Sequence, residues 1–266
     1  MKLIASDMDG TLLQDGAMQV SDRAIDLILQ LTQKGYLFVA ASGRQYSNLK
    51  RQFKDAAKDM AFLCENGAVV FYKDQLLFHS PMKHAIAMEL CEDIYSRSGC
   101  EVLISGKDVS YLKPKDPTFL DRMQNIVKNN VVVIQEFTEI KEAIVKISVY
   151  EKAGIVENSA NYFLNQWSSR LKCTVSGFGW LDFVNPEVNK GNSLTNLMNT
   201  LQIKKEDTYA FGDNFNDLEM LKTVQYGFVM ENAVEEIKQQ FTYRATLVED
   251  ELEKLLNGCC SSQGKE

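Results

Sequence analysis

Two carboxylates stand directly after the first apolar run of the chain. Asp7 and Asp9 lie in the segment Asp7-Met8-Asp9-Gly10-Thr11-Leu12, which follows the β-rich residues 3–6. In open α/β folds, functional groups gather at the carboxyl ends of the strands, so the position and the acidic chemistry agree. Two acids after a strand also commonly solvate a turn. This pair by itself leaves both interpretations open.

Two further segments place polar groups after apolar runs. Ala41-Ser42-Gly43-Arg44 offers a hydroxyl and backbone amides suited to phosphate oxygens, although Ser-Gly is also an ordinary turn. Gly212-Asp213-Asn214-Phe215-Asn216-Asp217 adds two acids and amide groups, although Asp and Asn also begin helices. Because Mg²⁺ prefers oxygen ligands, these carboxylates together indicate a magnesium site.

A fourth segment, Asn189-Lys190-Gly191, precedes a predicted helix near the end of the chain. The Lys190 ammonium is suited to a position beside a phosphoryl group and a carboxylate, although a single lysine is most often a solvated surface charge. All four segments follow strands or open helices, and each carries a group that phosphoryl transfer needs. Their conjunction favours a functional site over four unrelated turns.

The elements that position these segments follow an alternating pattern. Short β-rich runs alternate with helical periodicity at both ends of the chain, which predicts an α/β fold with a doubly wound, mainly parallel sheet. A helix begins after Ser21 and closes at Lys34-Gly35. Strands are expected at 3–6, 37–41, 62–64, 69–72, 76–78, 208–211 and 228–230, and further helices at 46–56, 192–201, 217–223, 234–241 and 250–256.

A different pattern interrupts this alternation and predicts an inserted α+β cap domain. Strands are expected there at 102–105, 110–113, 144–150, 173–176 and 181–184, and helices at 84–96, 118–127 and 156–171. The predicted domains are a catalytic core at 1–81 and 187–257, a cap at 82–186 and a flexible tail at 258–266.

The four segments, in this order, resemble the motifs of the haloacid dehalogenase-like (HAD) superfamily. The large insertion after the second segment is similar to that of its Cof-type sugar-phosphatase family, as are Glu65-Asn66-Gly67-Ala68 and Met230-Glu231-Asn232-Ala233. The resemblance covers the chain except its last residues. It implies a Rossmann-like core and a magnesium-dependent phosphatase that hydrolyses small phosphorylated metabolites, chiefly sugar phosphates, through an aspartyl-phosphate.

The resemblance also implies roles for single residues. Asp7 corresponds to the nucleophile and Asp9 to the general acid/base, and Asp217 would orient the waters of the metal. The implied magnesium ligands are Asp7, Asp9 and Asp213, and the implied phosphate-binding residues are Met8, Ser42, Gly43, Lys190 and Asn216.

The implied reaction follows from charge. A carboxylate and a phosphate repel each other, so magnesium and Lys190 are needed to offset the repulsion during displacement. Asp9 would protonate the leaving alkoxide and then activate the attacking water. Halide departure needs no proton, so this second aspartate favours a phosphatase over a dehalogenase.

An inserted cap is suited to covering the site and selecting the leaving group. The candidate specificity residues are Arg44, Asn66, Tyr111, Lys113, Phe178, Trp180 and Asp182, each of which could equally be a packing or rim residue. Two alternatives stay open: a phosphomutase of the same superfamily, and a non-catalytic regulatory module that binds a metabolite.

The composition of the chain limits the classes of partner that we expect it to bind. A net charge of -7, without a basic cluster interleaved with aromatics, argues against nucleic acid. No apolar stretch is long enough to span a membrane and no signal peptide is recognisable, so we expect a cytoplasmic protein without a membrane partner. No interface helix is readable, which favours a monomer. We expect Cys64, Cys91, Cys100 and Cys173 to be free thiols, with Cys259-Cys260 in a loose tail.

Overall fold

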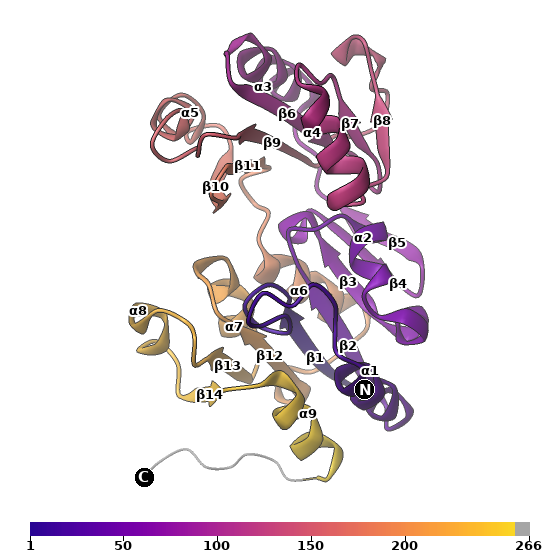
Figure 1. The fold of residues 1–266 in the computed structure, drawn as a ribbon. Helices are drawn as coiled ribbons and strands as arrows, with labels where there is room; N and C mark the ends of the chain where they lie inside the picture. Colours follow the sequence, from indigo (N-terminus) through magenta and orange to yellow (C-terminus); the bar gives the residue numbers. More distant parts are fainter. Residues whose placement is uncertain (259–266) are drawn as a thin grey trace. The chain divides into compact units, whose positions relative to one another are not determined.

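The computed structural model describes residues 1–258 and contains two compact units (Figure 1). The first consists of Met1–Arg44, Leu49–Leu77 and the chain from Asn189 onward, and the second of Gln45–Asn48 and Phe78–Val188. The segment Gln45–Asn48, which the sequence places in the core, is thus grouped with the second unit. The predicted tail, including Cys259-Cys260, lies outside the described residues except for Gly258.

The first unit is built on an eight-stranded sheet of order β14-β13-β12-β1-β2-β3-β4-β5. All neighbouring pairs from β14 to β3 are parallel, and β4 runs antiparallel to β3. The strands are β1 (Lys2–Asp7), β2 (Tyr36–Ala41), β3 (Ala61–Cys64), β4 (Val69–Tyr72), β5 (Gln75–His79), β12 (Thr208–Gly212), β13 (Tyr226–Met230) and β14 (Tyr243–Ala245).

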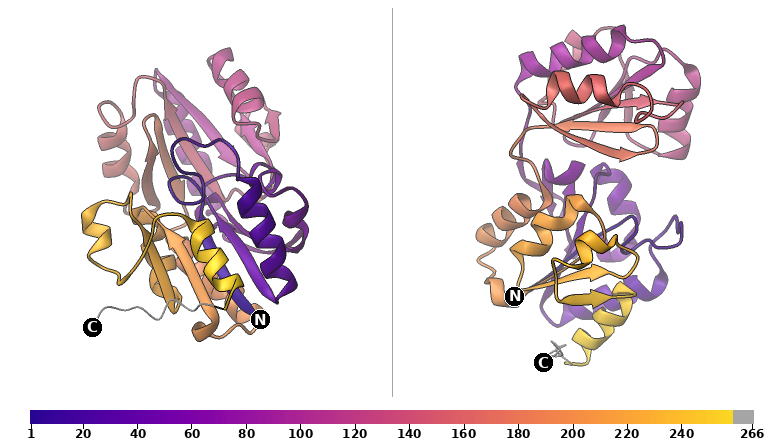
Figure 2. Two further views of the ribbon diagram at one scale, coloured as in Figure 1. Left: turned by 60° about the horizontal axis from the view of Figure 1, so that its bottom comes forward. Right: turned by 90° about the vertical axis from the view of Figure 1, so that its left-hand side faces the viewer.

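Helices lie on both faces of this sheet (Figure 2), which confirms the predicted doubly wound α/β fold class. α1 packs beside α9, and α6 packs beside α7. The helices are α1 (Asp22–Gln33), α2 (Tyr46–Arg51), α6 (Lys190–Thr200), α7 (Leu218–Thr223), α8 (Glu235–Lys238) and α9 (Val248–Leu256), joined by the 3₁₀ turns η1 (Lys54–Asp59), η2 (Glu65–Gly67), η5 (Lys205–Asp207) and η6 (Phe215–Asp217).

Local signals set several of these elements. Ser21 caps α1 by accepting a hydrogen bond from the Ala24 amide, as the sequence predicts. Lys73 and Asp74 both have positive φ and form the turn between β4 and β5. The expected helix at 46–56 is wrong in length, because it ends at Arg51 and gives way to a 3₁₀ turn at Lys54, whose φ is also positive.

The second unit is built on a six-stranded sheet of order β10-β11-β9-β6-β7-β8. Neighbouring pairs are antiparallel except β7 and β8. The strands are β6 (Cys100–Ser105), β7 (Ser110–Leu112), β8 (Val131–Val133), β9 (Lys146–Glu151), β10 (Lys172–Gly177) and β11 (Trp180–Val184).

Alternation along β6 divides the apolar side chains of this unit between the two faces of its sheet. Val102 and Ile104 belong to a large core with residues of α3 (His84–Ser96) and α5 (Ala160–Trp167), whereas Leu103 packs against α4 (Pro117–Asp121). A π-helical turn, η3 (Arg122–Ile126), continues α4, and the 3₁₀ turn η4 is Phe137–Glu139.

Besides the shorter helix α2, three further features differ from the sequence-based expectation. The strands β8 and β14 were not expected, and each is only three residues long, which is too short for a clear alternation pattern. The helix expected at 156–171 is confined to Ala160–Trp167.

Among residues 1–258, no helix combines the length and the apolar composition that a membrane span requires. The cysteines in this range are free thiols: Cys64, Cys91 and Cys100 are buried and Cys173 is half-buried.

Candidate active site

The acidic segments meet at the carboxyl ends of neighbouring parallel strands. β1 lies between β2 and β12, with Asp7 opposite Ala41 and Ser6 opposite Phe211. Because the connections from β1 and β12 leave in opposite directions along the sheet, this is a topological switch point, where open α/β sheets form their crevice. Register alone therefore brings Asp7, Ser42 and Asp213 to one edge.

A buried lysine joins two of the acids. The Lys190 ammonium donates to Oδ1 of Asp7 at 2.5 Å and to Oδ1 of Asp217 at 2.6 Å. Lys190 is 1% exposed, Asp7 7% and Asp217 0%, so these charges lie away from bulk water. Lys190 begins α6, whose N-cap is Asn189. The lysine of the fourth segment is therefore a buried member of the site.

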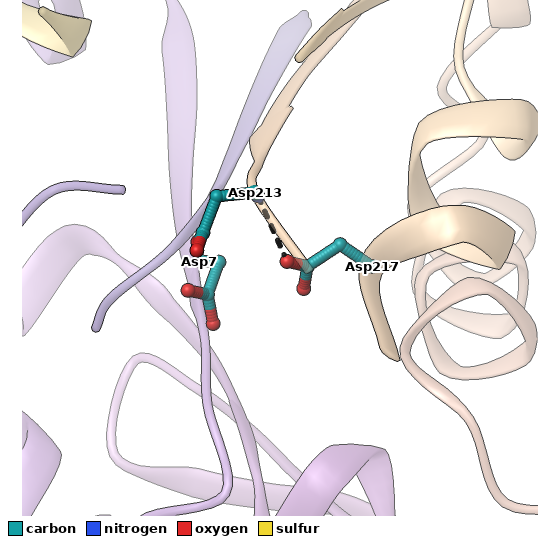
Figure 3. Close-up of side chains that lie close together, drawn as sticks. All are labelled: Asp7, Asp213 and Asp217. Carbon is teal, nitrogen blue, oxygen red and sulfur yellow. Dashed lines mark hydrogen bonds between the residues drawn. The ribbon is translucent and has the colours of Figure 1, made fainter. Parts of the chain in front are cut away.

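The remaining oxygen of Asp217 holds the loop after β12. Oδ2 accepts from the backbone amides of Asp213 and Asn214, both at 3.1 Å. Figure 3 shows Asp7, Asp213 and Asp217 grouped together, with the first of these bonds dashed. Asp217 thereby fixes the backbone that presents Asp213 to Asp7.

Two residues of the first loop bring it against the loop after β12. The Thr11 hydroxyl donates to Oδ1 of Asp213 at 2.6 Å, and Thr11 is buried. Gly10 has a φ of 90°, and a Cβ there would collide with the Asp213 carboxylate. A glycine is therefore required at position 10 both for its backbone conformation and for this close approach. The side-chain amide of Asn232 donates to the Gly10 carbonyl at 2.7 Å.

Burial and mutual repulsion perturb the ionisation of the cluster. Burial, together with the Asp217 carboxylate, raises the pKa of Asp7 to about 8, against the opposing effect of Lys190. Burial also raises the pKa of Asp213, while the hydrogen bond from Thr11 lowers it. Burial by itself would lower the pKa of Lys190, but the carboxylates of Asp217 and Asp7 raise it above its ordinary value.

The donor set fits a hard divalent cation. Asp7, Asp213 and Asp217 each offer a carboxylate oxygen within 4.8 Å of the others, and one ammonium accompanies these three carboxylates. The cluster consists of oxygen ligands and has an excess of negative charge, which suits magnesium.

The second segment forms a compact turn after β2. Ser42 is buried, its Oγ accepts from the Arg44 amide at 3.2 Å, and its carbonyl accepts from the Asn66 amide at 3.0 Å. A Cβ on Gly43 would lie 3.0 Å from Oδ1 of Asn66. Asn66, a predicted specificity residue, is thus held beside the predicted phosphate-binding turn.

Arg44 contacts the second aspartate of the first segment. Its Nη2 lies 2.5 Å from Oδ1 of Asp9 and its Nε 3.1 Å from Oδ2, a bidentate arrangement. The Asp9 side chain is 63% exposed, whereas that of Arg44 is 25% exposed. Sequence reasoning treated Arg44 only as a specificity candidate and missed this pairing, since residues 35 positions apart in sequence give no local signal.

Met8 and Asn216 differ in what they can offer a ligand. The Met8 side chain is fully buried, so Met8 can offer a ligand only its backbone. Further along the same loop, the amides of Gly10, Thr11 and Leu12 already donate to backbone carbonyls. Asn216 lies half-buried in η6.

The predicted cap residues are not gathered in one place within the second unit. Tyr111 packs against the core on the α3 side, and its hydroxyl donates to Oε1 of Glu142 at 2.7 Å. Lys113 pairs with Glu136 at 2.9 Å. Trp180 packs against the core on the α4 side of the sheet.

The two other cap candidates also differ. Phe178 is 77% exposed, while Asp182 is buried and accepts from the Ser148 hydroxyl at 2.6 Å. The five cap side chains therefore cannot all line one small pocket.

Sequence reasoning missed the contribution of Thr11 and Asn232. Both lie inside segments that the sequence singled out, but their partners, Asp213 and the Gly10 carbonyl, are 202 and 222 residues away. A hydroxyl or amide beside an acidic segment was the available signal.

Known proteins resemble the chain over nearly its whole length. A family model for haloacid dehalogenase-like hydrolases matches residues 4–251. A 5-amino-6-(5-phospho-D-ribitylamino)uracil phosphatase of Escherichia coli is 27% identical over 245 residues, which covers 92% of this chain and 90% of that protein. A phosphatase of the same name from Bacillus subtilis is 24% identical over 242 residues and covers 89% of each chain.

The fold has a solved counterpart in the HAD subclass IIB sugar phosphatase BT4131. That structure superposes with a TM-score of 0.76 at 18% sequence identity, covering 98% of this chain and 100% of that one.

Proposed function

This chain belongs to the haloacid dehalogenase-like hydrolases and is a phosphoric monoester hydrolase, and on that premise we propose that it is a magnesium-dependent enzyme that hydrolyses small sugar-type phosphates through an aspartyl-phosphate on Asp7. The observation that carries the proposal is the buried Lys190 ammonium between Asp7 and Asp217, beside Asp213. A group of carboxylates with one ammonium is suited to receiving a phosphoryl group together with a cation.

Asp7 acts as the nucleophile in this proposal. A carboxylate oxygen attacks phosphorus, the bond from phosphorus to the leaving oxygen breaks, and the phosphoryl group remains on Asp7 as an acyl phosphate. Lys190 holds the attacking carboxylate by its 2.5 Å contact and places positive charge next to the transferred oxygens. The Ser42 hydroxyl and the peptide amides after Met8 and Ser42 are suited to the remaining phosphate oxygens, and Asn216 to an oxygen on the side of η6.

Asp9 transfers the protons. In its acid form it protonates the leaving alkoxide, and the resulting carboxylate then removes a proton from the water that attacks the acyl phosphate, which releases inorganic phosphate and free Asp7. Arg44 positions this carboxylate by its bidentate contact.

Asp7, Asp213 and the backbone carbonyl of Asp9 would hold the magnesium ion, with Asp217 ordering its waters. A bound magnesium ion supplies positive charge that lowers the repulsion between nucleophile and phosphate. The excess of carboxylates over ammonium in the cluster supports this assignment.

We further propose that residues 82–186 act as a cap that selects the leaving group, using a subset of Tyr111, Lys113 and Trp180, while Arg44 and Asn66 contribute from the core. The two relatives named for a phosphoribityl compound support a phosphorylated sugar alcohol or sugar as the substrate class.

A panel of phosphorylated metabolites tests the proposal. We expect release of inorganic phosphate with Mg²⁺, with the highest kcat/KM for phosphates of sugars or sugar alcohols. Formation of an isomeric sugar phosphate without release of inorganic phosphate would instead identify a phosphomutase. No turnover of any compound, with the fold verified by circular dichroism, would contradict the proposal.

A further inference from the structure

The second unit contains a pocket of about 570 Å³ that none of the proposed catalytic residues lines. This volume is typical of small-molecule sites, which span about 300–1,000 Å³. The pocket lies at the start of β6, at Cys100. At the other end of β6, Ser105 pairs with Ser110, which Gln45 contacts. Five residues of strand separate the two ends by about 17 Å.

The acidic groups of the pocket are already engaged. Both oxygens of Glu101 accept from backbone amides, those of Lys115 at 3.1 Å and Asp116 at 2.8 Å. Asp116 in turn accepts from the amide and hydroxyl of Thr118 at 2.8 and 2.7 Å. The Asp121 carboxylate accepts a hydrogen bond from the side-chain amide of Asn125 at 2.7 Å. These carboxylates therefore stabilise the loop and α4.

Two cations of the pocket have no such engagement. Within residues 1–258, neither the Arg122 guanidinium nor the Lys152 ammonium forms a hydrogen bond or a close ion pair, and the Nε atom of Arg122 is buried without a partner. Lys152 acts on the pocket only at longer range: after the hydrogen bonds from Thr118, its charge lowers the pKa of Asp116. The Arg122 guanidinium lies 5.7 Å from the ring centroid of Tyr150, which limits the directions in which its N–H groups can point. Because Arg122 lines the pocket and its guanidinium has no acceptor among residues 1–258, an arriving oxyanion can pair with the guanidinium without displacing another group.

A π-helical turn presents this arginine. The Val127 amide donates to the Arg122 carbonyl at 2.9 Å, five residues back, instead of to the carbonyl four residues back. Such turns are rare and occur frequently at functional sites. Ile126, in the same turn, is 59% exposed, and Ile126 and Phe119 form an apolar part of the pocket wall.

We propose that this pocket is a second binding site, for a small aromatic anion. The carboxylate or phosphoryl oxygens of the ligand pair with Arg122, in a bidentate contact, and with Lys152. Its flat apolar body packs against the exposed Ile126 and the edge of Tyr150. None of the residues proposed for the phosphoryl site lines this pocket, and binding in it does not depend on turnover.

Tryptophan fluorescence reports on this pocket directly. The chain has two tryptophans, and the Trp180 ring lies 4.6 Å from that of Tyr150. We would titrate the whole protein with benzoate, phenylphosphonate and neutral benzyl alcohol. Benzoate and phenylphosphonate distinguish carboxylate from phosphoryl recognition, and the C–P bond of the phosphonate resists hydrolysis. Trp180→Phe identifies the part of the signal that comes from the pocket.

Single substitutions test which residues bind the anion. We expect saturable binding of at least one anion but not of benzyl alcohol, about tenfold weaker in Arg122→Gln and several-fold weaker in Lys152→Gln. Lys141→Gln, an exposed cation outside the pocket, is the matched control, and Asp7→Asn, which removes a carboxylate that repels anions, would bind more tightly than wild type if the anion instead occupied the phosphoryl site. Both should bind like wild type.

Three results would overturn the proposal: equal affinity in wild type and both pocket variants, equal binding of benzyl alcohol, or no saturable signal at millimolar concentrations of either anion. If Arg122→Gln fails to fold, as judged by circular dichroism, the exposed Lys152→Gln decides by itself.

Discussion

A buried ammonium contacts one carboxylate in the second unit and lies within a group of three carboxylates in the first. In the first unit the single ammonium of Lys190 lies among three carboxylates, those of Asp7, Asp213 and Asp217. In the second unit the Lys146 ammonium lies 3.8 Å from Asp182, and both residues are buried.

The difference separates two uses of buried polar groups. A paired cation and anion with a further hydroxyl, such as Lys146, Asp182 and Ser148, compensate one another's loss of water. Three close carboxylates with one ammonium repel each other and favour protonation or a bound cation. We therefore infer that the Lys146 group of the second unit stabilises the fold and that the Lys190 group of the first unit binds a ligand, and variants of each group test this contrast.

The largest expected effect is the loss of turnover in Asp7→Asn. The amide has nearly the shape of the carboxylate but is a poor nucleophile, so we expect activity to fall by about 10⁴-fold or more, equivalent to about 5.5 kcal/mol of barrier. The thermal midpoint should not fall, because one of three repelling carboxylates is removed. Phosphate release measures the turnover, and calorimetry measures the thermal midpoint. Near-wild-type turnover would remove Asp7 from its role.

Removing magnesium should reduce turnover almost as much as Asp7→Asn does. We expect activity to vanish in excess chelator and to return with Mg²⁺, while Ca²⁺ restores little because its larger, more variable coordination misplaces nucleophile and phosphate. Asp213→Asn should raise the Mg²⁺ concentration needed for half-maximal rate. Full activity in chelator would show that Lys190 by itself balances the cluster.

The effect of Asp9→Asn should depend on the leaving group. An alkyl sugar phosphate releases a basic alkoxide that needs a proton, whereas para-nitrophenyl phosphate does not. We expect phosphoenzyme formation to slow by about 10²-fold or more for the alkyl ester and much less for the aryl ester, in line with general acid catalysis. Rapid-quench measurement of the burst separates this step from later water activation. Equal slowing for both esters would mean that Asp9 only positions groups in the site and does not donate the proton.

Asp182→Asn should affect stability and not chemistry. It removes the negative charge that lies 3.8 Å from the buried Lys146 ammonium, which we expect to cost about 1–3 kcal/mol of unfolding free energy. Asp250→Asn, in the exposed pair with Arg23, is the control and should change stability by less than about 0.5 kcal/mol. Urea unfolding midpoints measure both. A loss of activity without a loss of stability would assign Asp182 to substrate recognition.

The smallest expected effect is that of Arg44→Lys. Lysine keeps the charge but loses the bidentate geometry on Asp9, so we expect up to about tenfold slower turnover of alkyl phosphates, equivalent to about 1.4 kcal/mol, and less for aryl phosphates. Arg23→Lys is a matched exposed control. If turnover of the aryl phosphate falls as much as turnover of the alkyl phosphate, Arg44 contacts the phosphate itself and does not act on proton transfer.

Local patterns predicted most elements of both units, because capping, turn chemistry and strand alternation act over a few residues. Ser21 at the start of α1 and the Lys73-Asp74 turn are examples. The patterns failed where these signals are weak: in the three-residue strands β8 and β14, and after Arg51, where helical periodicity continues but a positive φ at Lys54 ends the helix.

Local sequence is enough to predict which groups reach the sheet edge, since each acidic or hydroxyl-bearing segment follows its own strand and parallel strands end together. The pairing of these groups is visible only in the folded protein. The fold buries Lys190 between Asp7 and Asp217 and sets Arg44 on Asp9. It also leaves Arg122 without an acceptor among residues 1–258. The physical reason is that burial and partner distance depend on contacts between segments far apart in the chain, which no local pattern contains.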